Sequence, residues 1–149
     1  MSEISFYHLQ KSPLEMVLPR LLEKTLESDK RAVVMMGSAE RVEFLNNVLW
    51  TYKKDSWLPH GNAKDGHAEL QPIWLTVEDE NPNQAAFLFL ADGAQSNKMN
   101  DYERCFELFD GNDPDAVSAA RERWKVYQDA GHGVTYWSQN DQGGWEKSD

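Results

Sequence analysis

The segment "SAARERWKVYQDAG" (118–131) is the strongest candidate for binding chemistry, because it concentrates cations in a chain of formal net charge -10. Arg121, Trp124 and Lys125 fall on or beside one face of a helix at this spacing. A guanidinium can hold a carboxylate through two hydrogen bonds, and an indole beside it can cover apolar surface. Together these side chains predict a receptor for a ligand that is both acidic and apolar.

The same spacing divides the segment into an exposed face and a packed face. Val117 and Gln128 fall on the stripe of Arg121, and we expect this stripe to point away from the core. Arg123 falls towards the packed side, where it would pair internally or extend its charge to solvent. The alternative for Arg121 and Lys125 is that basic residues near a helix C-terminus complement the helix dipole. The packed side is expected to hold Ala116, Ala119, Ala120, Val126, Tyr127 and Ala130.

Two tryptophans mark a second candidate binding surface. Trp50 ends a helical pattern, and Trp57 follows in the loop "KKDSWLPHG", which has little periodicity that would bury an indole. Tryptophan and arginine dominate the energetics of protein interfaces. A partner contact is therefore favoured for Trp57, whereas core packing stays an open alternative for Trp50.

No metal, cofactor or catalytic site is predicted. His60, Asp65 and His67 lie in the loop "PHGNAKDGH" at a spacing that could suit a metal, but this composition is also normal for a surface loop. The single Cys105 excludes an intrachain disulfide and a multi-cysteine zinc site, and it fits a reducing cytosol. The chain has no G-x-S-x-G, H-E-x-x-H or C-x-x-C motif, so nothing commits it to being an enzyme.

The turn "MMGSAERVEF" occupies the place of a phosphate loop without its sequence. It lacks both G-x-G-x-x-G and G-x-x-x-x-G-K-[ST]. Asp92 follows the apolar run "FLFLA" and is expected to form a turn before Gly93. The alternative function is a nucleotide-binding or hydrolytic α/β domain of unknown substrate, with its ligand near Gly37, Ser38 and Asp92.

The elements that must position these residues alternate between strands and helices. This order predicts an α/β fold: a three-layer single domain with a mostly parallel sheet of about five strands, nucleotide-binding-like but without a phosphate loop. We expect the domain to span 1–138 and a polar, mobile tail to span 139–149. The strand candidates are 4–9, 31–37, 72–77, 85–92, 103–110 (which also fits a helix) and 133–138, and the helix candidates are 12–30, 39–52 and a final helix from 114.

Capping residues mark where the predicted helices begin. Ser12 is expected to cap the first helix with Pro13 at its first position, and Pro19 is expected to disturb that helix. Ser38 is expected to cap the second helix. Asp113 and Pro114 play the cap and first-position roles for the final helix.

Composition limits the classes of partner. The 149 residues suffice for one domain with its own core. The 25 acidic against 15 basic residues weigh against direct DNA binding, including stacking of single strands on exposed tryptophans. The start "MSEISFYHL" has no secretory pattern, and no apolar run approaches the ~20 residues that cross a bilayer. We therefore expect a cytoplasmic protein without a membrane partner.

Three blocks of sequence resemble the chi subunit of bacterial DNA polymerase III. They are "FYHL" at the start, "VLWTY…SWLPHG" (48–61) and "ARERWKVYQDAG" (120–131), and their order and spacing agree over about residues 4–137. The resemblance implies an α/β fold and a non-catalytic adaptor in the clamp-loader assembly. It also implies that one surface binds the acidic, phenylalanine-ended tail of single-stranded-DNA-binding protein, and that another binds the psi subunit or a helicase.

The resemblance assigns residues to both surfaces. The tail-binding positions fall on Arg121, Trp124 and Lys125, with Gln128 on the same stripe and Val117 where a basic residue is familiar. Trp124 stands where a tyrosine is familiar, which keeps an aromatic wall. The psi or helicase side falls on Trp50, Trp57, Pro59 and His60, with Trp57 in place of a familiar phenylalanine.

Overall fold

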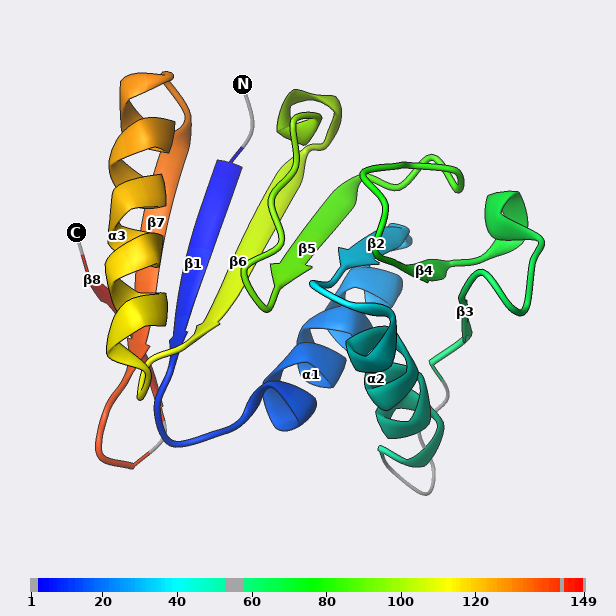
Figure 1. Ribbon diagram of the computed structural model, residues 1–149, viewed down its shortest axis with the longest axis horizontal. Helices are drawn as coiled ribbons and strands as arrows, with labels where there is room; N and C mark the ends of the chain where they lie inside the picture. Colours follow the sequence, from blue (N-terminus) through cyan, green and yellow to red (C-terminus); the bar gives the residue numbers. More distant parts are fainter. Residues whose placement is uncertain (1–2, 53–57, 143, 149) are drawn as a thin grey trace.

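Apolar segments of the chain assemble into one mixed sheet with helices on both faces (Figure 1). The computed structural model describes residues 3–52, 58–142 and 144–148. Its strands are β1 (Glu3–Leu9), β2 (Ala32–Met35), β3 (His60–Gly61), β4 (Ile73–Thr76), β5 (Phe87–Ala91), β6 (Arg104–Asp110), β7 (Gly133–Gln139) and β8 (Trp145–Ser148). Its helices are α1 (Leu14–Glu27), α2 (Ala39–Thr51) and α3 (Pro114–Asp129), with short 3₁₀ turns at Ala68–Leu70 and Met99–Asp101.

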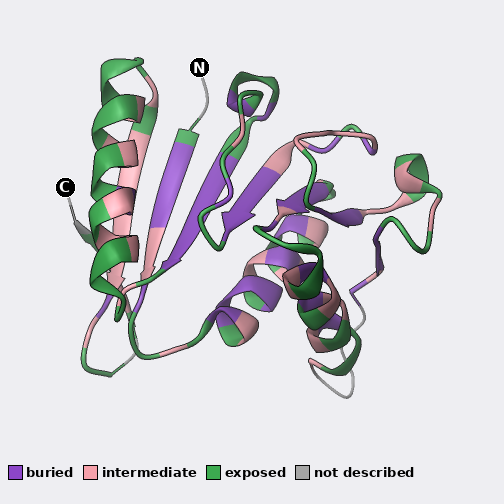
Figure 2. Cartoon of the chain, viewed as in Figure 1, coloured by how far each residue is buried: buried purple, intermediate pink, exposed green. Residues whose placement is uncertain are grey.

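The strands lie in the order β3-β4-β2-β5-β6-β1-β7-β8. All neighbouring pairs are parallel except β7 with β8, which are antiparallel. The inner strands are buried on both faces, as Figure 2 shows, and this explains why they are continuous apolar runs rather than alternating ones. Parallel strands bring their carboxyl ends to one edge of the sheet, where the turns that begin α1, α2 and α3 also lie.

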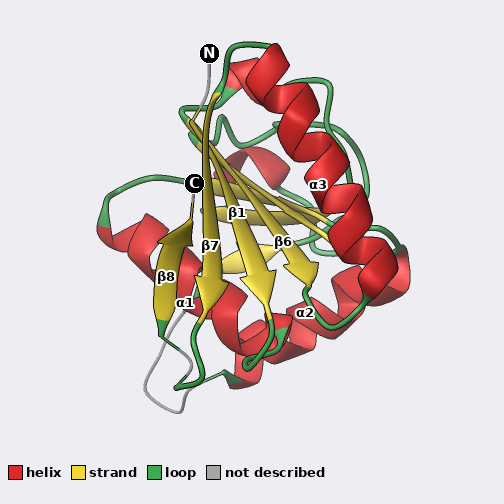
Figure 3. Ribbon diagram, turned by 90° about the vertical axis from the view of Figure 1, so that its left-hand side faces the viewer, coloured by secondary structure: helices red, strands yellow, loops and turns green. Residues whose placement is uncertain are grey.

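The helices divide between the two faces of the sheet. Leu18 of α1 and Leu45 of α2 are fully buried in one core, beneath which lie Val34 and Phe89 of the sheet. On the other face α3 covers a second core that contains Phe6 of β1. Figure 3 shows α3 on one side of the strands and α1 on the other. The predicted three-layer α/β class is therefore confirmed.

The predicted strand segments and two of the caps are confirmed. Segment 103–110 forms β6 rather than a helix. The Ser38 hydroxyl oxygen accepts a hydrogen bond from the Arg41 backbone N–H at 3.3 Å. The Asp113 carboxylate accepts from the Asp115 N–H at 3.0 Å, and Pro114 occupies the first turn of α3.

The predicted number of strands was too low, because the described residues form eight. The two-residue β3 is too short to produce a periodic signal. The other missed strand, β8, lies in the segment expected to be a mobile tail. Its sequence "WEKS" has no apolar alternation, and it forms by pairing antiparallel with β7. Before it, the Asn140 N–H donates to the Gly144 carbonyl oxygen at 2.8 Å.

The predicted cap of α1 was wrong. Pro13 occupies the N-cap position without a side-chain hydrogen bond, and the helix does not end at the buried Pro19, which lies inside it. The Ser12 hydroxyl instead accepts a hydrogen bond from Gln139 Nε2 at 3.2 Å. Gln139 Oε1 also accepts from three successive backbone N–H groups of the β1–α1 connection, at 2.9–3.1 Å. The turn before α1 is therefore stabilised by the Gln139 side chain of β7, and not by a cap from Ser12 as expected.

A buried ionic cluster attaches α3 to the sheet. Glu107 of β6, with its side chain 3% exposed, accepts a hydrogen bond from Arg123 Nε at 2.6 Å. Its second oxygen accepts from the Tyr127 hydroxyl at 3.0 Å. Burial raises the pKa of Glu107, and the Arg123 charge opposes that rise. Arg123 was expected either to pair internally or to extend its charge to solvent, and the internal pair is the one that forms.

Arg123→Met should lower the free energy of unfolding at pH 7 by about 3–5 kcal/mol, because it leaves the Glu107 carboxylate buried without its cation. The loss should shrink towards pH 5. Burial already raises the pKa of Glu107 above its ordinary 4.5, so the folded state binds this proton more tightly than the unfolded chain. Stability therefore rises as the pH falls through the raised pKa. Urea unfolding at the two pH values measures this.

The matched control is Arg121→Met, two residues away on the exposed side of α3, which should change stability by no more than about 0.5 kcal/mol. An equal loss from the two substitutions, or a loss from Arg123→Met that does not depend on pH, would contradict this role of Glu107.

Candidate functional site

The rotation of α3 differs from the one expected from its sequence. Val117 and Trp124 were expected to point away from the core, but both pack against it, whereas Val126 is 62% exposed. The Trp124 ring lies edge-on to Phe6 and to Tyr136, with ring centroids 5.6 Å apart in each pair. The half-buried indole therefore belongs to an aromatic cluster formed with β1 and β7, and it is not a free receptor surface.

Arg121, Lys125 and Gln128 are exposed on α3, as predicted. Arg121 lies close enough to Tyr136 to affect its pKa. Burial raises the pKa of this tyrosine, and the positive charge of Arg121 opposes that rise. Lys125 is one helical turn further along. Neither cation forms an ion pair within the described part of the chain. The dipole explanation is weakened for both, since they precede the last turn of α3.

A cavity of about 540 Å³ lies between the start of α3 and the end of β1. Arg121 and Lys125 line it, together with the apolar side chain of Val117. Trp124 and Gln128 do not line it. Its lining residues are His8, Gln10, Gly111, Asn112, Pro114, Val117, Ser118, Arg121, Glu122 and Lys125.

Sequence reasoning missed His8 and Gly111 as parts of this cavity. His8 Nδ1 lies 2.7 Å from the Tyr136 hydroxyl, which ties the ring to β7. A Cβ at Gly111 would overlap the His8 ring, so glycine is required for this close approach. Their positions could have predicted this contact. His8 and Gly111 lie at the carboxyl ends of β1 and β6, and these strands pair in parallel and bring the two residues together.

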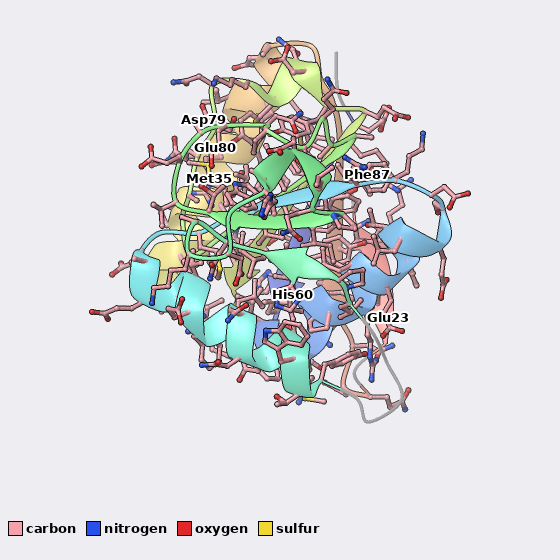
Figure 4. All side chains as sticks on the ribbon, turned by 90° about the vertical axis from the view of Figure 1, so that its right-hand side faces the viewer. Glu23, Met35, His60, Asp79, Glu80 and Phe87 are labelled. Carbon is pink, nitrogen blue, oxygen red and sulfur yellow. The ribbon has the colours of Figure 1, made fainter. Side chains whose placement is uncertain are left out.

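The second predicted surface is only partly assembled by the described residues. Trp50 is 60% exposed near the end of α2, which excludes the core alternative. Its ring centroid lies 4.8 Å from that of His60, which Figure 4 shows between β3 and α2. Pro59 is half-buried. Trp57 lies outside the described residues.

His60 supports this surface rather than forming it. The side chain is buried, with Nδ1 at 2.6 Å from the Leu58 carbonyl oxygen and Nε2 at 2.9 Å from Asn46 Oδ1. Both nitrogens therefore face protein oxygens, and neither is aimed at a metal. Within the described ranges, no group of three or more His, Cys, Asp or Glu side chains is placed to hold an ion.

The carboxyl edge of the sheet holds a larger crevice of about 810 Å³ between the starts of α1 and α3. Asp92 and Gly93 form the predicted turn there, with φ values of 55° and 79°. Asp92 also pairs with Arg41 at 2.9 Å. The acidic residues of the lining are Glu15, Asp92, Asp110, Asp113 and Asp115. They outnumber the cations of the lining, Lys11, Arg41 and Arg123, and their excess charge opposes the binding of nucleotide phosphates at this edge, where the alternative function would place them.

None of the helices in the described ranges combines the length and the apolar character needed to cross a membrane.

Two comparisons identify relatives of the chain. A protein-family model with the description "DNA polymerase III chi subunit, HolC" matches residues 1–135. A curated protein of Rickettsia prowazekii (strain Madrid E), "Probable DNA polymerase III subunit chi", is 32% identical over 110 residues. That alignment covers 72% of this chain and 67% of the relative. The family match ends within β7, before β8 begins.

The positions of Trp124 and Trp50 give opposite expectations for stability. Trp124→Ala should lower the free energy of unfolding by about 2–4 kcal/mol, because it removes the indole from between β1, β7 and α3. Trp50→Ala should change it by no more than about 0.5 kcal/mol, since that ring is mostly exposed. Chemical unfolding monitored by far-ultraviolet circular dichroism measures both. Equal losses would contradict the rotation of α3 described above.

Proposed function

The chain belongs to the DNA polymerase III chi subunit family, and on this premise we propose that the cavity beside α3 docks the acidic tail of single-stranded-DNA-binding protein. By holding that tail, the protein would act as a non-catalytic adaptor between single-stranded-DNA-binding protein and the clamp-loader assembly during replication. Membership of the family by itself establishes that the protein is an accessory subunit of DNA polymerase III.

The observation that carries the proposal is the pairing of cations with an apolar wall at one cavity. Arg121 and Lys125 line it beside a single carboxylate, Glu122, and neither cation forms an ion pair with the residues that the structure describes, in a chain with 25 acidic and 15 basic residues. Val117 and the His8 ring supply surface against which an apolar side chain can pack. This combination suits a peptide whose last residue is apolar and carries a terminal carboxylate.

Each cation has a distinct role in this proposal. The Arg121 guanidinium holds the terminal carboxylate through two hydrogen bonds. Lys125 lies one turn away and attracts the acidic residues that precede the end of the tail. An exposed charge pair contributes only about 0.2–1 kcal/mol and is screened by salt, so we expect binding to weaken as the ionic strength rises.

Trp124 and Gln128 take supporting roles. The half-buried indole packs against Tyr136, the tyrosine whose rise in pKa the charge of Arg121 opposes, so it supports the aromatic cluster next to Arg121. Gln128 lies on the exposed side of α3, two turns beyond Arg121, and offers an amide to the tail backbone. Trp124 therefore still provides the aromatic surface that the family resemblance implies, but as part of a packed cluster rather than as a protruding ring.

Arg121→Ala should weaken binding of an acidic peptide ending in Pro-Phe at least tenfold, because the terminal carboxylate loses its bidentate partner. Amidation of that terminus should weaken binding to the unsubstituted protein by a similar factor. Isothermal titration at low salt measures both.

Lys30→Ala serves as the control. Lys30 is partly exposed, does not line the cavity and pairs with Glu103. This variant should bind the peptide normally. Equal affinity of Arg121→Ala and the unsubstituted protein, or no binding by either, would remove the tail-docking proposal.

We further propose that Trp50 anchors a second partner, the psi subunit or a helicase. The supporting observation is its 60% exposure, which leaves a large indole without cover in the described part of the chain. Pro59 directly precedes His60, whose ring contacts Trp50; Trp57 is two residues before Pro59 in the sequence and lies outside the described residues.

Trp50→Ala should abolish capture of psi or a helicase while leaving capture of single-stranded-DNA-binding protein intact, because the two surfaces lie on different helices. Arg121→Ala should show the reverse pattern. Pull-downs with each variant separate the surfaces. Loss of both partners from either single substitution would show that the surfaces are not independent.

A further inference from the structure

A third surface lies between α1 and the β7–β8 hairpin, on the face of the sheet away from α3. It is a groove of about 320 Å³. Figure 3 shows α1 on this side of β7 and β8. The residues that line the groove are Tyr7, Ser12, Met16, Val17, Arg20, Leu21, Lys24, Trp137, Gln139 and Trp145.

Aromatic rings form the sheet side of the groove. Tyr7 stacks on Trp137, with centroids 6.4 Å apart and an interplanar angle of 16°. Trp145 meets Tyr7 edge-on at 5.1 Å. Both tryptophans are only partly buried, so their rings are available to a ligand. Trp145 belongs to β8, which lies beyond the residues that the family model matches.

Cations form the helix side of the groove. Met16, Arg20 and Lys24 follow one another at intervals of four along α1, and all three are exposed. The lining contains no carboxylate, and in the described ranges neither Arg20 nor Lys24 forms an ion pair. Lys147 pairs with Trp137 across the β7–β8 ladder, so its side chain is on this same face. The groove therefore gathers positive charge on a chain of net charge -10.

The spacing of the two α1 cations fits an extended peptide. Residues four apart on a helix rise about 6 Å, and side chains at alternate positions of an extended strand lie about 6.6–6.8 Å apart. Carboxylates at alternate positions of such a peptide can therefore meet Arg20 and Lys24 together. A long polyanion fits less well, because few cations are present and the rest of the acidic chain repels it.

We propose that this groove is a further docking site, which binds an acidic, apolar segment of a partner protein in an extended conformation. An apolar or aromatic side chain packs against Trp137 and Trp145, and carboxylates at alternate positions pair with Arg20 and Lys24. The site lies across the sheet from the α3 cavity and does not depend on it.

The test uses a fluorescein-labelled peptide, Gly-Asp-Phe-Asp-Phe-Asp, with an amidated C-terminus, and measures its anisotropy with full-length protein carrying Arg121→Ala. The amide and this background remove the proposed terminal contact at α3, so failure of either proposal can be distinguished from failure of the other. The double variant R20Q/K24Q should weaken binding at least tenfold, and Trp145→Ala should do the same. Lys30→Gln is the matched control, because Lys30 is partly exposed, lies outside both proposed sites and pairs with Glu103, and it should have no effect.

Charge reversal provides an independent check that does not depend on loss of binding. A Lys-for-Asp version of the peptide should bind R20E/K24E more tightly than it binds the parent protein. Far-ultraviolet circular dichroism and thermal unfolding verify that the variants fold. Absence of peptide binding, or equal binding by R20Q/K24Q, would overturn the proposal. Binding of a dT12 oligonucleotide in place of the peptide would also overturn it, in favour of a nucleic-acid groove.

Discussion

The buried Glu107 carboxylate determines how α3 sits on the sheet. A charge at this depth is tolerated only with partners, and Arg123 and Tyr127 provide them from one side of α3. Because Arg123 must point inward, Arg121, about 200° away around the helix, must point outward. One internal ion pair therefore determines which of two neighbouring arginines is available to a ligand.

The same rotation shapes the surface beside α3. It turns Trp124 towards Phe6 and Tyr136, so the indole stabilises the helix instead of standing free. It also places Val117 in the wall of a cavity whose other side is the His8 ring. The acidic chain can then present a local basic site without a basic protein surface, since Arg121 and Lys125 line this cavity and form no ion pair within the described residues.

The outer strands add surfaces to a sheet whose centre is purely structural. The inner parallel strands are covered on both faces and offer no binding surface. Beyond β1, however, Trp137 and Trp145 of the β7–β8 hairpin are only partly buried, and they line a groove together with the cations of α1. The opposite edge is similar in principle, because Trp50 of α2 lies exposed above the short β3. The two proposed surfaces of the sheet edges, at the β7–β8 hairpin and at Trp50, therefore lie outside the central strands that the helices cover.

The sequence by itself determined the features that depend on neighbours in the chain. Apolar runs predicted the buried parallel strands, cap chemistry predicted the starts of α2 and α3, and helical spacing predicted the inward role of Arg123. It also singled out Arg121 and Lys125. Only the tertiary structure decided the rotation of α3, the cap of α1, the pairing of β8 and the supporting role of His60. The physical reason is that these depend on contacts between distant segments: Trp124 meets Phe6, and Ser12 meets Gln139. Helical periodicity leaves two adjacent stripes nearly equivalent, and packing against β1 and β7 selects between them.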